Sequence, residues 1–195
     1  MGGVVIRNHN VAPQLLDYLG RREERFTDCD PGILDALRRH GRGEVDEDAF
    51  WEVYKKATGD PLPPVQGSLL GRFFSPVLDG PTIAVLEELK RKGMRVVCGT
   101  NVIDAHYHIH QKNGDYGIFD KVYPSHLMKI SKPDQDFYRY ILDAEDVLPG
   151  EAFFTDDSEQ NVQAACQVGL NSFLYSDSHE LRRQLASLEL GGRKQ

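Results

Sequence analysis

The sequence lacks the features that mark secreted, membrane-spanning and nucleic-acid-binding proteins. It has three cysteines, Cys29, Cys98 and Cys166, an odd number whose spacing fits no metal motif. No stretch approaches the ~20 apolar residues of a membrane span, and no charged-then-apolar start resembles a signal peptide. The net charge of −7 argues against non-specific binding to nucleic acid or anionic membranes. We therefore expect a cytoplasmic protein with buried, reduced thiols.

The composition that remains is that of an ordinary globular protein, with 40% hydrophobic and 27% charged residues in a chain of 195. The pattern changes near Gly80. Before this point apolar residues recur at helical spacing, and after it helices alternate with short apolar strands. Alternating strands and helices predict an α/β fold with a parallel sheet. The segment before Gly80 predicts a small helical bundle, and residues 191–195 are expected to form a frayed tail.

The expected helices and strands follow from capping residues and periodicity. In the cap, helices are expected over 30–40 and 46–58, the second capped by Asp46 and ended by Gly59, with a further apolar stretch over 69–78. In the core we expect helices over 81–92, 104–112, 133–144, 158–168 and 178–188, and strands over 94–99, 121–123, 152–155 and 171–175.

Three groups of polar residues fall at the expected ends of strands or starts of helices, the edge where open α/β sheets bind ligands. Thr100 and Asn101 follow a strand and suit a phosphate oxygen. Lys132 precedes a proline at a helix start, where an anion would compensate its charge. Asp156 and Asp157 are adjacent carboxylates that a divalent cation would hold together. Taken singly, each group also fits ordinary helix capping.

The order and spacing of these groups resemble the haloacid dehalogenase superfamily of phosphohydrolases, over nearly the whole chain. Segments 41–50 and His106 resemble the cap and core of its sugar-phosphate phosphatase branch, which includes glucose-1-phosphate phosphatases. The segments that carry the wider resemblance are 2–5, 96–101, 131–133 and 153–157, with Asn161 beyond them.

The resemblance implies a Rossmann-like parallel sheet, a core of residues 1–9 and 80–190, with an inserted helical cap of residues 10–79.

The resemblance also implies Mg²⁺-dependent hydrolysis of a small phosphorylated metabolite. Thr100 and the backbone of Asn101 would bind the phosphoryl group, and Lys132 would neutralise its charge. Asp157 and the carbonyl of Gly2 would bind Mg²⁺ directly. Asp156 would either be a further ligand or hydrogen-bond to the groups that bind the ion. The cap would close over the site and select the leaving group.

The nucleophilic aspartate of this family would stand two residues before Gly2, and this chain starts at Met1. The family's second aspartate, often the general acid/base, is replaced by Gly2 itself. Losing a nucleophile costs on the order of 10⁴–10⁶ in rate, so we expect the chain as written to be inactive or impaired. The alternative is a binding or regulatory protein that keeps a phosphate pocket without turnover.

The same absence affects the expected sheet. In the family the nucleophile ends the central strand, between the strands that lead to Thr100 and Asp156. Without that strand its neighbours would lie roughly 10 Å apart, with unpaired backbone groups costing about 1–3 kcal/mol each. Residues 2–7 could slide in, another chain could donate a strand, as in a homodimer, or the natural polypeptide could start further upstream.

Two other groups of residues have simpler interpretations. His106 and His110 would share one face of a helix, but a zinc site needs further ligands and none is obvious nearby. We expect a partly exposed helix face there, with His106 near the opening of the site. Trp51, Phe73 and Phe74 are expected to pack in the core of the cap.

Overall fold

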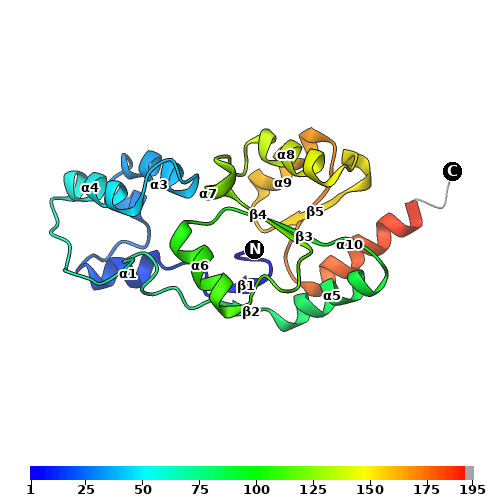
Figure 1. The fold of residues 1–195 in the computed structure, drawn as a ribbon, viewed down its shortest axis with the longest axis horizontal. Coiled ribbons are helices and arrows are strands. Elements are labelled where there is room, and N and C mark those ends of the chain that lie inside the picture. The colour runs from blue at the N-terminus through cyan, green and yellow to red at the C-terminus, as the bar shows by residue number, and fades with distance from the viewer. Residues whose placement is uncertain (192–195) are drawn as a thin grey trace.

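The structure is a computed structural model in which residues 1–191 are described. Its strands form three separate pairs between layers of helices (Figure 1). Strand β3 (Val97–Thr100) runs parallel to β4 (Lys121–Pro124), and β5 (Phe153–Asp156) runs parallel to β6 (Asn171–Leu174). The short strand β1 (Ile6–Arg7) is antiparallel to β2 (Val77–Leu78). The fold is therefore α/β with parallel strands, as predicted.

Helices cover both sides of these strands (Figure 1). On one side α5 (Gly80–Arg91) packs against α10 (Ser178–Gly191), and on the other α8 (Gln135–Glu145) packs against α9 (Glu159–Val168). The approach of α8 to β3 needs a glycine, because a Cβ on Gly99 would lie 2.9 Å from Cδ1 of Ile141 and 3.0 Å from Cε1 of Phe137. None of the helices in residues 1–191 combines the length and apolarity needed to cross a bilayer.

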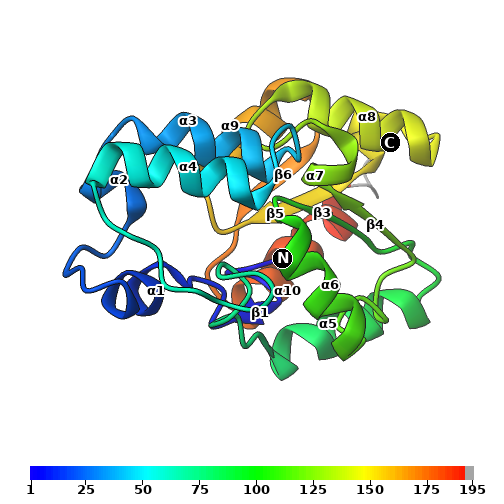
Figure 2. The same ribbon diagram turned by 60° about the vertical axis from the view of Figure 1, so that its left-hand side comes forward.

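The segment before Gly80 is mainly helical, as predicted. It contains α1 (Ala12–Tyr18), α2 (Phe26–Cys29), α3 (Ile33–Gly41) and α4 (Glu47–Thr58), and Figure 2 shows α3 and α4 side by side. The core of this segment is aromatic, and Phe26 of α2 makes edge-to-face contacts with Phe50, Trp51 and Tyr54 of α4. Within α4, Trp51 also contacts Phe50 and Tyr54 edge to face.

The local signals for α4 are confirmed. The side chain of Asp46 accepts a hydrogen bond of 2.8 Å from the Ala49 N–H, and Gly59 ends the helix with φ of 75°. One other expectation needs correction, because helix α3 starts at Ile33 and residues 31 and 32 form a turn. The apolar stretch over 69–78 forms turns and β2.

In the core, α6 is Asp104–Asn113, a short α7 is Ser125–Met128, and a 3-10 turn covers Pro149–Glu151. Pro133 is not the first residue of a helix, because it lies in a turn and α8 is capped by Asp134. The expected burial of the thiols is wrong for Cys166, which is exposed on α9, whereas Cys98 is buried. Gly191 is the last residue of α10, and the rest of the expected tail lies outside the described residues.

The central position of the sheet is not filled by residues 2–7 as a regular strand. Instead the chain turns at once, since the Met1 carbonyl accepts hydrogen bonds from the N–H groups of Val5 (2.9 Å) and Ile6 (3.0 Å). Beyond the turn, β1 pairs with β2 rather than with β3 or β5. The strand pairs β3–β4 and β5–β6 therefore remain separate sheets in the described part of the chain.

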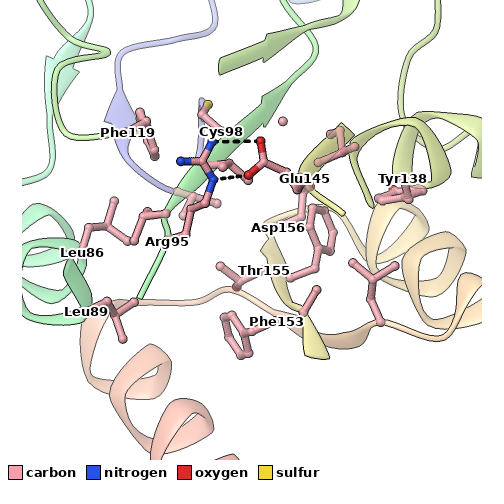
Figure 3. Close-up of a pocket in the computed structure, with 18 of the residues that line it drawn as sticks. Leu86, Leu89, Arg95, Cys98, Phe119, Tyr138, Glu145, Phe153, Thr155 and Asp156 are labelled. Atoms are coloured by element: carbon pink, nitrogen blue, oxygen red, sulfur yellow. Dashed lines mark hydrogen bonds and ion pairs between the residues drawn. The ribbon is translucent and has the colours of Figure 1, made fainter. Parts of the chain in front are cut away.

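A cavity of about 380 Å³ lies between these two sheets. Residues of β3 and β5 line it together with apolar side chains of α5 and α8 (Figure 3). Arg95 and Glu145 form an ion pair at its wall. The hydroxyl of Thr155 is buried without a hydrogen-bond partner among the described residues. Apolar side chains thus form most of the lining, and the charged groups of Lys132 and Asp156 also face the cavity.

Candidate active site

The ammonium group of Lys132 joins the ends of β3 and β5. It donates hydrogen bonds to the carbonyl of Gly99 (3.0 Å) and to Oδ2 of Asp156 (2.6 Å). Both charged residues are buried, with 7% and 3% of their surfaces exposed. A buried pair of this kind needs good geometry to offset its desolvation, and the second bond to Gly99 supplies it.

Lys132 is held in place through its backbone. The side chain of Asn101 accepts the Lys132 N–H at 2.9 Å and donates to the Lys132 carbonyl at 2.9 Å. This double hydrogen bond links the loop after β3 to the segment before α8. Thr100 is the last residue of β3 and is buried, and its hydroxyl donates to the carbonyl of Asn101 at 3.5 Å.

Asp156 is fully occupied by hydrogen bonds. Besides Lys132, it accepts bonds at Oδ1 from the Ser158 N–H (3.0 Å) and the Asn161 side chain (2.8 Å). Burial alone would raise the pKa of Asp156, but attraction to Lys132 and these hydrogen bonds outweigh it, so the pKa lies below its ordinary value. Asp156 is therefore an anion that positions Lys132.

Asp157 points to a different environment from Asp156. It is exposed and lies against the turn at the start of the chain. A Cβ placed on Gly3, whose φ is +78°, would come within 1.9 Å of Oδ2 of Asp157. Only glycine therefore leaves room for this carboxylate beside the backbone of Gly2 and Gly3.

Within residues 1–191 no group of three His, Cys, Asp or Glu side chains is arranged to hold a metal ion. The oxygen donors present nevertheless fit Mg²⁺, which binds through one or two carboxylates and keeps several waters. Asp157 is open to solvent, and the Gly2–Gly3 backbone lies beside it. Asp156 is the less suitable ligand because Lys132 and Asn161 already occupy its oxygens.

The structure also shows contacts that sequence reasoning missed. His9 packs on Gly2, and its Nδ1 accepts a hydrogen bond of 3.1 Å from the Gly3 N–H. The double hydrogen bond of Asn101 to Lys132 joins residues 31 positions apart. Neither contact has a sequence signal, because both depend on loops that meet only in the folded chain.

The histidines of α6 face inward more than expected. His110 is buried and bonded to Asp115 at 2.7 Å, whereas His108 is exposed. His106 stacks on Phe74 with ring centroids 3.7 Å apart, and its Nε2 lies 3.0 Å from the Leu70 carbonyl. Burial lowers the pKa of His106 to about 4, opposed by the hydrogen bond to Leu70. His106 thus joins the segment before Gly80 to the core as a neutral ring.

We expect this buried ring to make the protein sensitive to acid. Because the pKa of His106 is near 4 in the folded chain and ~6.5 in an unfolded chain, unfolding takes up a proton between these values. Stability should therefore fall as the pH drops from 6.5 to 4. In His106→Phe, which keeps the stacking on Phe74, this loss should be smaller. Urea unfolding at pH 7 and pH 4.5 measures it.

The matched control for this prediction is His108→Phe, since His108 is exposed on the same helix. That variant should show the same dependence on pH as the unaltered chain. An unchanged dependence in His106→Phe would show that other groups cause the loss.

Comparisons with known proteins agree with the fold. Residues 80–175 match the sequence model of the family described as haloacid dehalogenase-like hydrolase. The fold resembles that of a HAD family enzyme from Bacteroides thetaiotaomicron, with a TM-score of 0.71 and 23% identity over 93% of this chain and 95% of that one. It also resembles a predicted HAD-like family hydrolase from Porphyromonas gingivalis, with a TM-score of 0.74 and 17% identity over 98% of this chain and 93% of that one. The chain therefore has the HAD-like fold, and residues 80–175 are similar to the haloacid dehalogenase-like hydrolase family.

Among characterised proteins the chain is similar to the sesquiterpene phosphatase astK of Aspergillus oryzae, with 33% identity over 101 residues, 51% of this chain and 52% of that protein. It also matches the drimenol cyclase drtB of Aspergillus calidoustus, with 35% identity over 77 residues, 40% of this chain and 15% of that protein. The match thus spans about half the length of the first relative and much less of the second. A second structure of the Bacteroides enzyme, a mutant, is a complex with magnesium and inorganic phosphate (TM-score 0.70, 22% identity, 90% and 91% covered).

Proposed function

We propose that the chain binds the phosphate group of a small phosphorylated metabolite at the carboxyl ends of β3 and β5, in the manner of a HAD-like phosphomonoester phosphatase. The observation that carries this proposal is the buried Lys132, fixed by Asn101 and Asp156 beside the end of β3. A positive charge fixed at the end of β3, the strand that Thr100 ends, favours an anion there. If Lys132 only filled space in the core, an apolar residue would do so without the free-energy cost of desolvating a charge.

Each residue would have a distinct task. The hydroxyl of Thr100 and the backbone of Asn101 would donate to phosphoryl oxygens, and Lys132 would neutralise their charge. Asp156 would hold Lys132 in position. Mg²⁺, when bound through Asp157 and the Gly2 carbonyl, with Asp156 in reach, would neutralise further phosphate charge and orient the group.

Two substrate classes are candidates, one suggested by motifs in the sequence and the other by a relative. We propose residues 10–79 as the cap that selects the leaving group, on a core of residues 1–9 and 80–190, in a cytoplasmic protein. Sugar phosphates such as glucose 1-phosphate are one candidate class, on the motifs of segment 41–50. Terpenyl phosphates are the other, because a sesquiterpene phosphatase is 33% identical over half of this chain.

We further propose that hydrolysis depends on a nucleophilic aspartate two residues before Gly2, a position that the given sequence does not include. The alternative function is binding of a phosphorylated ligand for regulation, without hydrolysis. Both functions need the same Lys132 and Asp157, so binding and turnover must be measured separately.

The deciding experiment compares two proteins. One is the chain as given, and the other carries an upstream apolar strand that ends in Asp two residues before Gly2. We expect the extended protein to hydrolyse an aryl phosphate with Mg²⁺ on the order of 10⁴-fold faster than the chain as given. Its activity on glucose 1-phosphate and on farnesyl phosphate then separates the two substrate classes.

The control is the same extension ending in Asn, which should be as inactive as the unextended chain. If the Asp extension gives no turnover while inorganic phosphate still binds, the binding function is favoured. If neither protein binds phosphate, both proposals are wrong.

A further inference from the structure

The imidazole of His9 lies in the space that a side chain at position 2 would take. A Cβ placed on Gly2 would lie 2.8 Å from Cγ and 2.9 Å from Cδ2 of His9. Real Cβ atoms do not approach other atoms so closely. Gly2 is thus the residue that allows the ring to lie against the backbone at this point.

The ring is held in one orientation. Asn8 has φ of 55°, a left-handed turn that asparagine tolerates, and it directly precedes His9. The Gly3 N–H then donates to Nδ1 of His9 at 3.1 Å, while also reaching the Ile6 carbonyl at 3.0 Å. A neutral imidazole that accepts at Nδ1 carries its hydrogen on Nε2. His9 therefore presents an N–H donor on an exposed side chain.

The turn of Gly2 and Gly3 links the ring of His9 to the candidate site. The same two-glycine turn carries His9 against Gly2 and the carboxylate of Asp157 against Gly3. Asp157 in turn directly follows Asp156, the partner of Lys132. A ligand held near Lys132 and Asp157 would thus have the imidazole of His9 beside the turn that borders it.

We propose that His9 donates its Nε2–H to an oxygen of the phosphorylated ligand, as a binding residue that replaces a side chain at position 2. This inference rests on the proposed phosphate site. The role needs only a neutral ring. It also explains why a glycine stands at position 2, because any larger residue there would displace the donor.

The test measures binding of inorganic phosphate in the presence of Mg²⁺ by calorimetry, using the full chain. One hydrogen bond to a charged group contributes about 1.5 kcal/mol, so His9→Ala should bind phosphate about tenfold more weakly. Gly2→Ala should cause a similar loss by displacing the ring. His9→Gln, which keeps an N–H donor, should recover part of the affinity. His108→Ala, which alters an exposed side chain of α6, should bind normally.

Nitrogen NMR provides a second readout that does not depend on affinity. The ¹⁵N shifts of His9 should report hydrogen on Nε2, and the Nε2 resonance should move when phosphate is added. If His9→Ala binds phosphate normally and these resonances stay fixed, while Lys132→Met abolishes binding, the role of His9 is wrong and the phosphate site stands. If phosphate does not bind to the unaltered chain, the site and the role of His9 fail together.

Discussion

Lys132→Met should cost about 3–5 kcal/mol of folding free energy, because it leaves the carboxylate of Asp156 buried without its partner. This is a large part of the ~5–15 kcal/mol that stabilises a typical domain. The substitution keeps the volume of the side chain but removes the bonds to Asp156 and to the Gly99 carbonyl. Urea unfolding measures the loss, and phosphate binding should disappear in the same variant.

The pH dependence identifies the cause. Asp156 has a lowered pKa beside Lys132 and therefore stabilises the fold at neutral pH, an effect that is lost as the pH falls through that pKa. In Lys132→Met burial would dominate and raise this pKa above the ordinary value of ~3.9, so the deficit should shrink when the carboxyl is protonated.

A double variant tests whether charge rather than packing is responsible. Lys132→Met with Asp156→Asn removes both charges and keeps an Oδ1 acceptor for Ser158 and Asn161. It should recover most of the stability while phosphate binding stays lost. A double variant as unstable as Lys132→Met would contradict the buried-pair explanation.

Filling the cavity between β3 and β5 should raise the free energy of unfolding, the second large effect that we expect. An upstream apolar strand of six residues would bury side chains against the walls of the ~380 Å³ cavity and pair with two strand edges. Burial of apolar surface contributes about 25 cal/mol per Å², so a gain of a few kcal/mol is expected. Urea unfolding measures it, together with reduced binding of an apolar dye such as ANS.

A Gly-Ser extension of equal length is the control, since it has neither apolar side chains nor strand propensity, and it should leave stability unchanged. Light scattering distinguishes a strand donated by a second copy of the chain from a strand that lies upstream in the same polypeptide. A dimer that becomes a monomer on apolar extension would indicate that a second copy fills the cavity of the unextended chain. If the apolar extension gives no gain over the Gly-Ser control, the cavity is not a strand position.

The sequence alone determined the α/β class, the position of most helices and strands, and the clustering of polar residues at strand ends. These features are local, because a capping residue such as Asp46 and a glycine such as Gly59 define a helix through their own neighbours. The place of Asp156 at the end of β5 likewise follows from an apolar run that stops there.

Only the tertiary structure decided how these residues meet. Lys132 and Asp156 are 24 positions apart, and their pairing depends on β3 and β5 ending side by side. The approach of His9 to Gly2, the burial of His110 and the exposure of Cys166 depend on which surfaces other segments cover. The separation of the sheet into two parallel pairs has the same origin, because strand pairing is a contact between distant segments and no local pattern specifies it.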